Sequence, residues 1–333
     1  MRKIGENIAL KLMRQIDPET SHKLALKALN IGLGPNAKQD APELAVELAG
    51  LRLSNPIGVA AGFDKNGEAI APLMRAGFGF VEIGAVTPRA QTGNPKPRLF
   101  RLKEDHAAIN RFGFNNQGME IVGERLSAKR PSGVLGVNLG ANKDSEDRAA
   151  DYAKVMTHLG GLVDFATINV SSPNTEKLRD LQGVDALRSL ISGVLEARAK
   201  SAPNTRVFLK IAPDLTTQEI EEICALALDL QIDALVATNT TLSREGLQSQ
   251  HKGEMGGLSG KPLRARSTEV IKIAHNVLGD KLPIIGVGGI DSADAALEKL
   301  DAGAKAIQLY TGLVYQGFGL IDEIKVGLLN KVK

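Results

Sequence analysis

The stretch Phe165-Ala166-Thr167-Ile168-Asn169-Val170 continues directly into Ser171-Ser172-Pro173-Asn174-Thr175, so an apolar segment ends in a cluster of amides, hydroxyls and a proline. A plain turn is one interpretation, because Asn and Ser are ordinary turn residues and Pro173 has the fixed φ that turns favour. The same order, an apolar run and then a polar or glycine-rich cluster, recurs along the chain. These clusters would converge if the runs were strands of a closed barrel. The stretch therefore predicts one barrel strand with a site at its end.

Eight apolar runs alternate with segments of helical periodicity. They span residues 57–60, 80–83, 134–137, 165–168, 207–211, 234–237, 284–287 and 306–309. Continuously apolar strands are typical of a parallel sheet that is covered on both faces. Eight such units over roughly 280 residues favour a (β/α)8 barrel over a doubly wound sheet. The glycines at 286, 288 and 289 follow the seventh run and lack the spacing of a dinucleotide-binding loop.

In a (β/α)8 barrel the chemistry gathers at the carboxyl ends of the strands. Five asparagines lie there or in the connections, namely Asn110, Asn138, Asn169, Asn174 and Asn239. Their amides both donate and accept, which suits the edges of a cyclic imide or a flavin. Glycine-rich loops after the last two strands predict a phosphate site. Neither a pair of strand-end carboxylates nor a Ser-His-Asp set is present, which argues against hydrolysis.

Two lysines at strand ends, Lys65 and Lys210, supply fixed positive charges. One suits a substrate carboxylate and the other the electron-rich side of a reduced flavin, whereas a buried ion-paired lysine is the alternative for each. The formal net charge of +3 and its even spread argue against nucleic acid as a partner. The single cysteine, Cys224, excludes an intrachain disulfide and fits a reducing compartment. The five histidines lack ligand spacing, so no protein-bound metal is predicted.

The first 33 residues predict two short amphipathic helices. Apolar residues with helical spacing are Ile4, Ile8, Leu12 and Ile16, and then Leu24, Ala28 and Ile31. The helix-start motif Asp17-Pro18-Glu19-Thr20 lies between the two stripes. Flanking lysines and arginines suit a helix pair on an anionic membrane surface, and a helical hairpin packed on the main domain is the alternative. No stretch approaches the roughly 18 apolar residues of a membrane span.

A polar linker follows these helices, so we expect a helical domain at residues 1–40 and a barrel domain at residues 41–333. The barrel domain should open with a hairpin, Glu43–Leu48 and Leu51–Leu53, that turns at Ala49-Gly50. Two connections are too long for simple loops. Residues 85–115 contain Arg98–Leu102, which predicts a small sheet over the barrel mouth, and residues 239–263 are rich in glycine and polar residues.

Nine segments occur together and in order across nearly the whole chain, and with them the sequence resembles the dihydroorotate dehydrogenases. The segments are 60–65, 82–84, 97–101, 109–116, 169–175, 210–214, 238–241, 256–260 and 285–290. Two features resemble the quinone-dependent class 2. Ser172 stands where class 1 enzymes carry a cysteine base, and the helical extension resembles a quinone-access domain. The resemblance shifts the expectation for the helix pair toward membrane association.

The resemblance implies oxidation of (S)-dihydroorotate to orotate, the redox step of de novo pyrimidine biosynthesis. Ser172 would remove the C5 proton, with Thr175 as a possible member of the proton relay, while hydride leaves C6. The implied substrate residues are Lys65, Asn110, Arg111, Phe112, Gly113, Phe114, Asn169, Asn174, Asn239 and Thr240. The implied FMN residues are Ala61, Gly62, Phe63, Asp64, Lys65, Ala85, Asn138, Asn169, Lys210, Thr238, Gly260, Gly289, Tyr310 and Thr311. A quinone would enter near His22, Arg101 and Tyr310.

One position departs from the family pattern. Ala85 stands where relatives often have a threonine that touches FMN, so only a backbone contact would remain, at a cost of about 0.5–1.5 kcal/mol at most. The implied protein is a monomer with one FMN and no metal, peripheral on the cytoplasmic face of the cell membrane. Two other classes stay open, a Schiff-base lyase that uses Lys210 as nucleophile and a noncatalytic lipid-surface binding protein.

Overall fold

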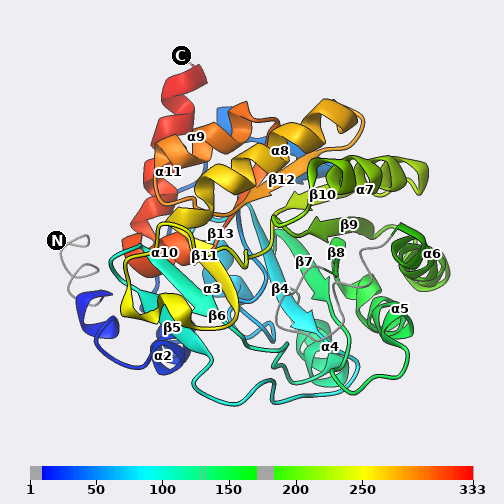
Figure 1. Ribbon diagram of the computed structural model, residues 1–333, viewed down its shortest axis with the longest axis horizontal. Coiled ribbons are helices and arrows are strands. Elements are labelled where there is room, and N and C mark those ends of the chain that lie inside the picture. The colour runs from blue at the N-terminus through cyan, green and yellow to red at the C-terminus, as the bar shows by residue number, and fades with distance from the viewer. Residues whose placement is uncertain (1–9, 129, 131, 171–183, 333) are drawn as a thin grey trace.

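The computed structural model describes residues 10–128, 130, 132–170 and 184–332, and its centre is a closed barrel of parallel strands (Figure 1). Around the barrel the order is β3, β4, β7, β8, β9, β10, β12 and β13, with β13 pairing back to β3. The strands span Ile57–Val59, Phe80–Val86, Val134–Leu139, Phe165–Asn169, Arg206–Ile211, Ala234–Ala237, Ile284–Val287 and Ala304–Leu309. The predicted (β/α)8 barrel and its eight strands are confirmed.

The interior of the barrel is filled by large apolar side chains near the amino ends of the strands. Phe165 stacks on Phe208 with ring centroids 4.6 Å apart and meets Phe80 edge-on at 6.2 Å. The hairpin of β1 (Val46–Leu48) and β2 (Leu51–Leu53) buries Leu48 and Leu53 against the same cluster. This end of the barrel is therefore closed by apolar packing, which leaves the opposite end for polar side chains.

The predicted hairpin is confirmed, with one correction at its start. Ala49 and Gly50 form the turn, both with positive φ. Residues Pro42–Leu44, however, form the short 3-10 helix η1 rather than the beginning of a strand. Leu44 is buried there, and Pro42 provides the first residue of the turn without needing a backbone donor.

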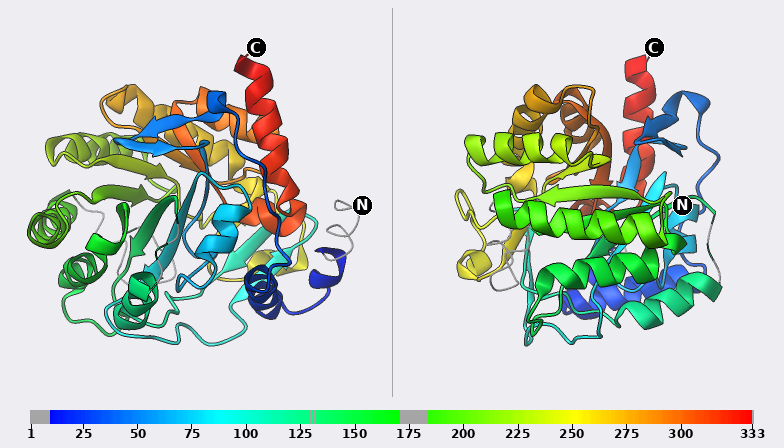
Figure 2. Two further views of the ribbon diagram at one scale, coloured as in Figure 1. Left: turned by 180° about the vertical axis from the view of Figure 1, so that it is seen from behind. Right: turned by 90° about the vertical axis from the view of Figure 1, so that its right-hand side faces the viewer.

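Helices surround the barrel on its outside, as the views of Figure 2 show. They are α3 (Ile70–Arg75), α4 (Met119–Ala128), α5 (Arg148–Leu159), α6 (Val184–Ser201), α7 (Thr217–Asp229), α8 (Arg264–Leu278), α9 (Ala293–Asp301), α10 (Thr311–Gln316) and α11 (Gly319–Val332), with the 3-10 turns η2 (Gly160–Leu162), η4 (Gln250–Gly253) and η5 (Lys261–Leu263). Local signals start several of them. Thr216 and Glu219 form a capping box at α7, and the Ser292 side chain caps α9.

A three-stranded antiparallel sheet lies at the carboxyl end of the barrel. It consists of β5 (Leu99–Leu102), β6 (Ala107–Asn110) and β11 (Gly257–Gly260), with β6 in the centre. The small sheet predicted around Arg98–Leu102 is confirmed. The connection at 239–263, which is too long for a simple loop, contributes β11 to it, because Gly257 pairs with Asn110 and Gly260 with Ala107.

The helix α2 (Pro18–Asn30) packs beside β5 in the same region (Figure 1). Asp17 caps it by accepting a hydrogen bond from the backbone N–H of Thr20 at 2.8 Å, so the helix-start motif is confirmed. The first expected helix falls largely outside the described residues. No helix in the described ranges combines the length and apolar character needed to cross a membrane. The domain boundary at residues 40 and 41 stays a prediction.

Candidate active site

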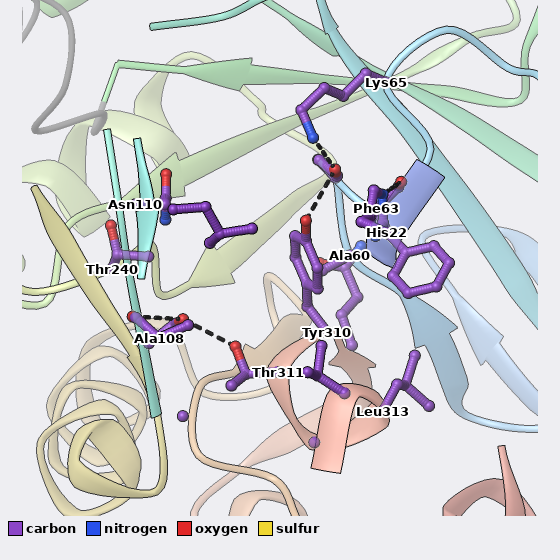
Figure 3. Close-up of a pocket in the computed structure, with 18 of the residues that line it drawn as sticks. His22, Ala60, Phe63, Lys65, Ala108, Asn110, Thr240, Tyr310, Thr311 and Leu313 are labelled. Atoms are coloured by element: carbon purple, nitrogen blue, oxygen red, sulfur yellow. Dashed lines mark hydrogen bonds between the residues drawn. The ribbon is translucent and has the colours of Figure 1, made fainter. Parts of the chain in front are cut away.

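One cavity of about 590 Å³ opens at the carboxyl ends of the barrel strands (Figure 3). Its polar end is lined by side chains that follow the strands, among them Asn138, Asn169, Lys210 and Asn239. Its other end runs beneath α2 and is apolar. The lining there includes Met13, Ala25, Leu29, Leu313 and Phe318. A polar ligand site and an apolar channel are thus continuous.

The asparagines that the sequence predicts are brought together in this cavity. The Asn169 amide N–H donates to the side-chain oxygen of Asn138 at 2.9 Å, and the Asn239 amide donates to the side-chain oxygen of Asn169 at 3.3 Å. The Tyr152 hydroxyl donates to the backbone carbonyl of Asn169 at 2.7 Å from below. Residues that are separated by up to about a hundred positions therefore form one hydrogen-bonded surface of amides.

Lys65 projects toward the polar end from the loop after β3 (Figure 3). Its Nζ donates to the carbonyl of Gly62 at 2.6 Å and lies 4.3 Å from the centroid of the Phe112 ring. Burial lowers the pKa of Lys65 to about 8, against a smaller opposing effect of Glu19. The ammonium is held by a carbonyl and a ring face and is available to an anionic ligand.

Lys210 lies on β9, inside the barrel mouth, and only 5% of it is exposed. Burial lowers the pKa of its ammonium, while the nearby Glu82 carboxylate acts in the opposite direction. Gly260 is the last residue of β11, and Gly289 lies in the loop after β12. Both have a positive φ, and a Cβ at either position would collide with neighbouring backbone. Thr311 beside them donates its hydroxyl to the Ser259 hydroxyl at 2.8 Å.

His22, on α2, sits where the polar and apolar ends of the cavity meet. Its Nε2 lies 2.6 Å from the carbonyl of Phe63, and its ring meets the Phe63 ring edge-on at 5.0 Å. Tyr310 stands beside it and donates its hydroxyl to Gly62 at 3.2 Å (Figure 3). Burial, then the charge of Lys65, lowers the pKa of His22 to about 3, so the imidazole is neutral at physiological pH.

Arg101 also lines the cavity, and it holds the chain segment before α2. Its guanidinium donates to the carbonyls of Arg14 at 2.9 Å and Ile16 at 3.1 Å. Burial lowers the pKa of Arg101 somewhat, yet an arginine remains charged at any physiological pH. The predicted quinone-access residues His22, Arg101 and Tyr310 therefore lie along one wall.

Nearly all predicted site residues with a described position line this cavity. In addition to those named above, they are Ala61, Gly62, Phe63, Ala85, Asn110, Phe112, Gly113, Phe114, Thr238 and Thr240. Among the described residues, Asp64 and Arg111 are the two predicted members that do not. Ser172 and Asn174, together with Thr175, lie outside the described residues, so their predicted roles have no structural account.

Asp64 and Arg111, which do not line the cavity, make hydrogen bonds and ion pairs with neighbouring residues instead. The buried Asp64 carboxylate accepts backbone N–H groups of Glu68 at 2.9 Å and Ala69 at 2.7 Å, which shapes the loop that carries Lys65. Arg111 pairs with Glu254 at 2.7 Å and stacks over Phe100. Asp64 lies in the loop after β3 and Arg111 directly follows β6, and the hydrogen bonds of both side chains are made outside the cavity lining.

Several polar residues of the site were not predicted from the sequence, among them Glu82, Asn115 and Gln308, and also Arg14, Ser21 and Ser259. Glu82 is completely buried on β4 and accepts hydrogen bonds from Asn138 and from Gln308, which lines the cavity from β13. Asn115 also lines it. A signal was present for two of them, because Glu82 and Gln308 interrupt otherwise apolar strands, and buried polar groups in such runs need partners.

A closed parallel barrel whose carboxyl end holds a cavity lined by amides and lysines defines a (β/α)8-barrel enzyme. The chain belongs to the dihydroorotate dehydrogenase family, because the sequence model of that family, described as dihydroorotate dehydrogenase, matches residues 43–332.

Relatives and solved structures agree with this assignment. A dihydroorotate dehydrogenase (quinone) of Cereibacter sphaeroides is 56% identical over 328 residues, which cover 98% of this chain and 92% of the relative. Its namesake in Agrobacterium fabrum is 49% identical and covers 100% and 93%. The crystal structure of DHODH from Eimeria tenella in complex with ferulenol is similar with a TM-score of 0.90, 40% identity and coverage of 95% and 92%.

Proposed function

We propose that this protein is a quinone-dependent dihydroorotate dehydrogenase, which oxidises (S)-dihydroorotate to orotate in de novo pyrimidine biosynthesis. The observation that carries the proposal is the continuity of this cavity, which joins a polar end of amides and lysines to an apolar end beneath α2. A polar substrate and an apolar electron acceptor could then use the same cofactor from opposite ends. The relatives are named dihydroorotate dehydrogenase (quinone), which gives a polar substrate for the polar end and an apolar acceptor for the apolar end.

The residues at the polar end fit an FMN. The Oε1 of Gln308 and the Oγ1 of Thr240 are buried and have no hydrogen-bond partner among the described residues, and both residues line the cavity. Amides and hydroxyls of this kind match the alternating donors and acceptors of a flavin ring, and Lys210 adds a positive charge. Once bound, FMN would supply the acceptor for the C6 hydride and the electrons for the quinone.

We assign the holding of FMN to the predicted residues that line the cavity. They are Ala61, Gly62, Phe63, Lys65, Ala85, Asn138, Asn169, Lys210, Thr238, Gly260, Gly289, Tyr310 and Thr311. Gly260 and Gly289 allow the close backbone approach that a phosphate needs. Asp64 acts indirectly, since its carboxylate shapes the loop of Lys65.

Dihydroorotate is assigned to the same end of the cavity. Its carboxylate would meet Lys65, and its ring amides would meet Asn110, Asn169, Asn239 and Thr240, with Phe112, Gly113 and Phe114 beside it. Asn174 would join them, and Ser172 would take the C5 proton, as the sequence predicts for residues outside the described ranges. Arg111 supports this wall through its ion pair with Glu254.

A quinone is assigned to the apolar end. Its ring would reach His22 and Tyr310, and its tail would lie along Leu29, Leu313 and Phe318. Because His22 is neutral and its Nε2 donates to the carbonyl of Phe63, its Nδ1 can accept one hydrogen bond there without bringing a charge into an apolar channel. The two electrons and two protons that the quinone gains balance the hydride and proton that dihydroorotate loses.

The helical domain of residues 1–40 is assigned to a lipid surface. Leu12, Ile16, Leu24 and Ile31 are exposed large apolar side chains on the described part of it. Together with the lysines and arginines of the same segment they suit peripheral binding to the cytoplasmic face of the cell membrane. We expect the protein to act there as a monomer, without a metal. The lyase alternative with Lys210 as nucleophile is not favoured, since the chain belongs to a dehydrogenase family.

Anaerobic spectroscopy tests the proposal. The purified protein should be yellow, contain one FMN per chain and bleach when dihydroorotate is added under nitrogen. A ubiquinone analogue with an alkyl tail should then restore the colour. A colourless protein, or one whose carbonyl substrate is trapped on Lys210 by borohydride, would contradict it.

A further inference from the structure

A carboxylate that no predicted role includes lies directly beneath the amides of the site. Glu82 is on β4 and has 0% exposure. One of its oxygens accepts the side-chain N–H of Asn138 at 2.7 Å, and the other accepts the side-chain N–H of Gln308 at 2.5 Å. Glu82 thus joins β4, β7 and β13 inside the barrel, between the apolar interior and the cavity.

A carboxylate accepts hydrogen bonds and donates none, whereas a carboxamide has a donor end and an acceptor end. Asn138 and Gln308 must therefore turn their NH2 groups toward Glu82. The oxygen of Asn138 then faces the other way, where it accepts from the amide of Asn169 at 2.9 Å. A reversed Asn169 would place two oxygens against each other.

The same direction continues along the cavity wall. The oxygen of Asn169 accepts from Asn239 at 3.3 Å, and the oxygen of Asn239 accepts from the backbone N–H of Thr240 at 2.8 Å. This amide chain, Glu82–Asn138–Asn169–Asn239–Thr240, is closed at one end by a pure acceptor and at the other by a pure donor. Every amide between them has one orientation that keeps all the bonds, and hydrogen-bond chains of this kind reinforce one another.

Gln308 extends the effect to the opposite side of Glu82. Because its NH2 faces the carboxylate, its oxygen is left buried without a partner among the described residues, at a position that lines the cavity. A buried acceptor in that state favours a ligand that brings a donor, since an unsatisfied polar atom is costly. Glu82 therefore determines the orientation of Gln308, and it shares control of the amide chain with the backbone N–H of Thr240.

We propose that Glu82 is a positioning residue that fixes the orientation of Gln308 and, together with the backbone N–H of Thr240, that of the amide chain. Through them it makes the site selective for planar rings that carry alternating carbonyl and N–H groups. The inference rests on the proposed function, in which these amides bind FMN and dihydroorotate. It differs from a plain counter-charge role for Glu82 beside Lys210, which would not depend on the direction of the amides.

Two variants separate orientation from the presence of a polar side chain. In Glu82→Gln the backbone N–H of Thr240 still fixes the direction of the amide chain, so the new amide presents its oxygen to Asn138 and its NH2 to residue 308. Gln308 must then turn its oxygen toward residue 82 and its NH2 toward the cavity. In the double variant Glu82→Gln with Gln308→Glu the carboxylate moves across the existing 2.5 Å contact. Residue 82 must then give its NH2 to residue 308 and present its oxygen to Asn138, so residue 308 again presents an oxygen to the cavity.

The readouts are the Kd of the apoprotein for FMN and the Kd for orotate, measured from the change in the flavin spectrum, with circular dichroism as a check of folding. Glu82→Gln should weaken FMN binding at least about tenfold, because the reversed Gln308 would present a donor where the ligand needs an acceptor. The double variant should return to within about threefold of the wild type, as the same hydrogen-bond energies predict.

Three outcomes would overturn the inference. Glu82→Gln could bind FMN and orotate as the wild type does, the folded double variant could bind as weakly as the single variant, or the double variant could fail to fold although it retains every bond of the chain. If Glu82→Gln itself does not fold, the FMN affinity of the double variant is the deciding measurement. A wild-type protein that binds neither FMN nor orotate would instead contradict the proposed function.

Discussion

The Nζ of Lys65 lies 4.3 Å from the centroid of the Phe112 ring, and Arg98 approaches the same ring at 5.7 Å. Arg98 is in turn paired with Glu19 on α2 at 2.8 Å. The ring of Phe112 is therefore shared by a lysine of the polar end of the cavity and an arginine that fastens the helix over its apolar end. The polar end of the cavity and the helix over its apolar end are therefore connected through Phe112, Arg98 and Glu19.

Orotate binding should weaken as the pH rises through about 8. Burial lowers the pKa of Lys65 to about 8 in the free protein, so above that pH the ammonium is increasingly neutral and attracts a carboxylate less. The loss should approach about tenfold in affinity per pH unit well above 8, by linkage of proton and ligand binding. Titration of the FMN-bound protein with orotate between pH 7 and 10 measures this. Lys65→Met should bind weakly at every pH, and a persisting pH dependence in that variant would assign the titration to another group.

His22 should make the protein less stable in mild acid. Its pKa of about 3 in the folded state lies below the usual 6.5, so the unfolded state binds the proton first as the pH falls. The contribution to the free energy of unfolding is therefore fully present above about pH 6.5 and is lost as the pH falls toward 3. Between pH 7.5 and 5 the wild type should lose up to about 2 kcal/mol more than His22→Gln. Urea unfolding at the two pH values measures the difference, and equal losses would show that His22 does not titrate in this way.

Ser172→Ala should bind FMN and orotate but lose rapid flavin reduction. A positioned base contributes about a hundredfold or more to proton removal, and alanine offers no hydroxyl for it. Stopped-flow bleaching by dihydroorotate at neutral pH measures the rate. The neighbouring Ser171→Ala serves as the matched control and should bleach at the wild-type rate. Normal bleaching in Ser172→Ala would reject the proton-removal role.

The barrel could be predicted from sequence because its information is local. Runs such as Ala234–Ala237 are continuously apolar, and the Ala49-Gly50 turn and the Asp17 cap carry their own residue preferences. The strand β11 could not be predicted in the same way. Its Gly257–Gly260 segment has no strand pattern of its own and is fixed by pairing with β6, some 150 positions earlier in the chain.

The site was predictable to the extent that topology alone places residues at strand ends. Asn138, Asn169 and Lys210 follow that rule. The direction of a side chain depends on partners that the sequence does not identify, so Asp64 and Arg111 were expected in the cavity and turn elsewhere. Glu82 was not predicted, because a lone carboxylate in an apolar run indicates a buried hydrogen-bond partner but does not show which residue that partner is.

Glu19→Gln should impair the quinone reaction and spare the reaction with dihydroorotate. Burial alone would raise the pKa of Glu19, but its bonds to Arg98 and the charges of Lys96 and Lys23 lower it overall, so the pair is ionised. Removing one partner of a buried ion pair costs about 3–5 kcal/mol, which should loosen α2 from the loop that carries Arg98. The KM for a quinone analogue should rise several-fold at an unchanged rate of anaerobic bleaching, and amide exchange in Pro18–Asn30 should accelerate. Lys23→Gln is the matched control, because Lys23 is 63% exposed and lies 3.9 Å from Glu19, so its loss should cost less than about 1 kcal/mol. Equal quinone kinetics in both variants would show that the Glu19–Arg98 pair does not hold the channel in shape.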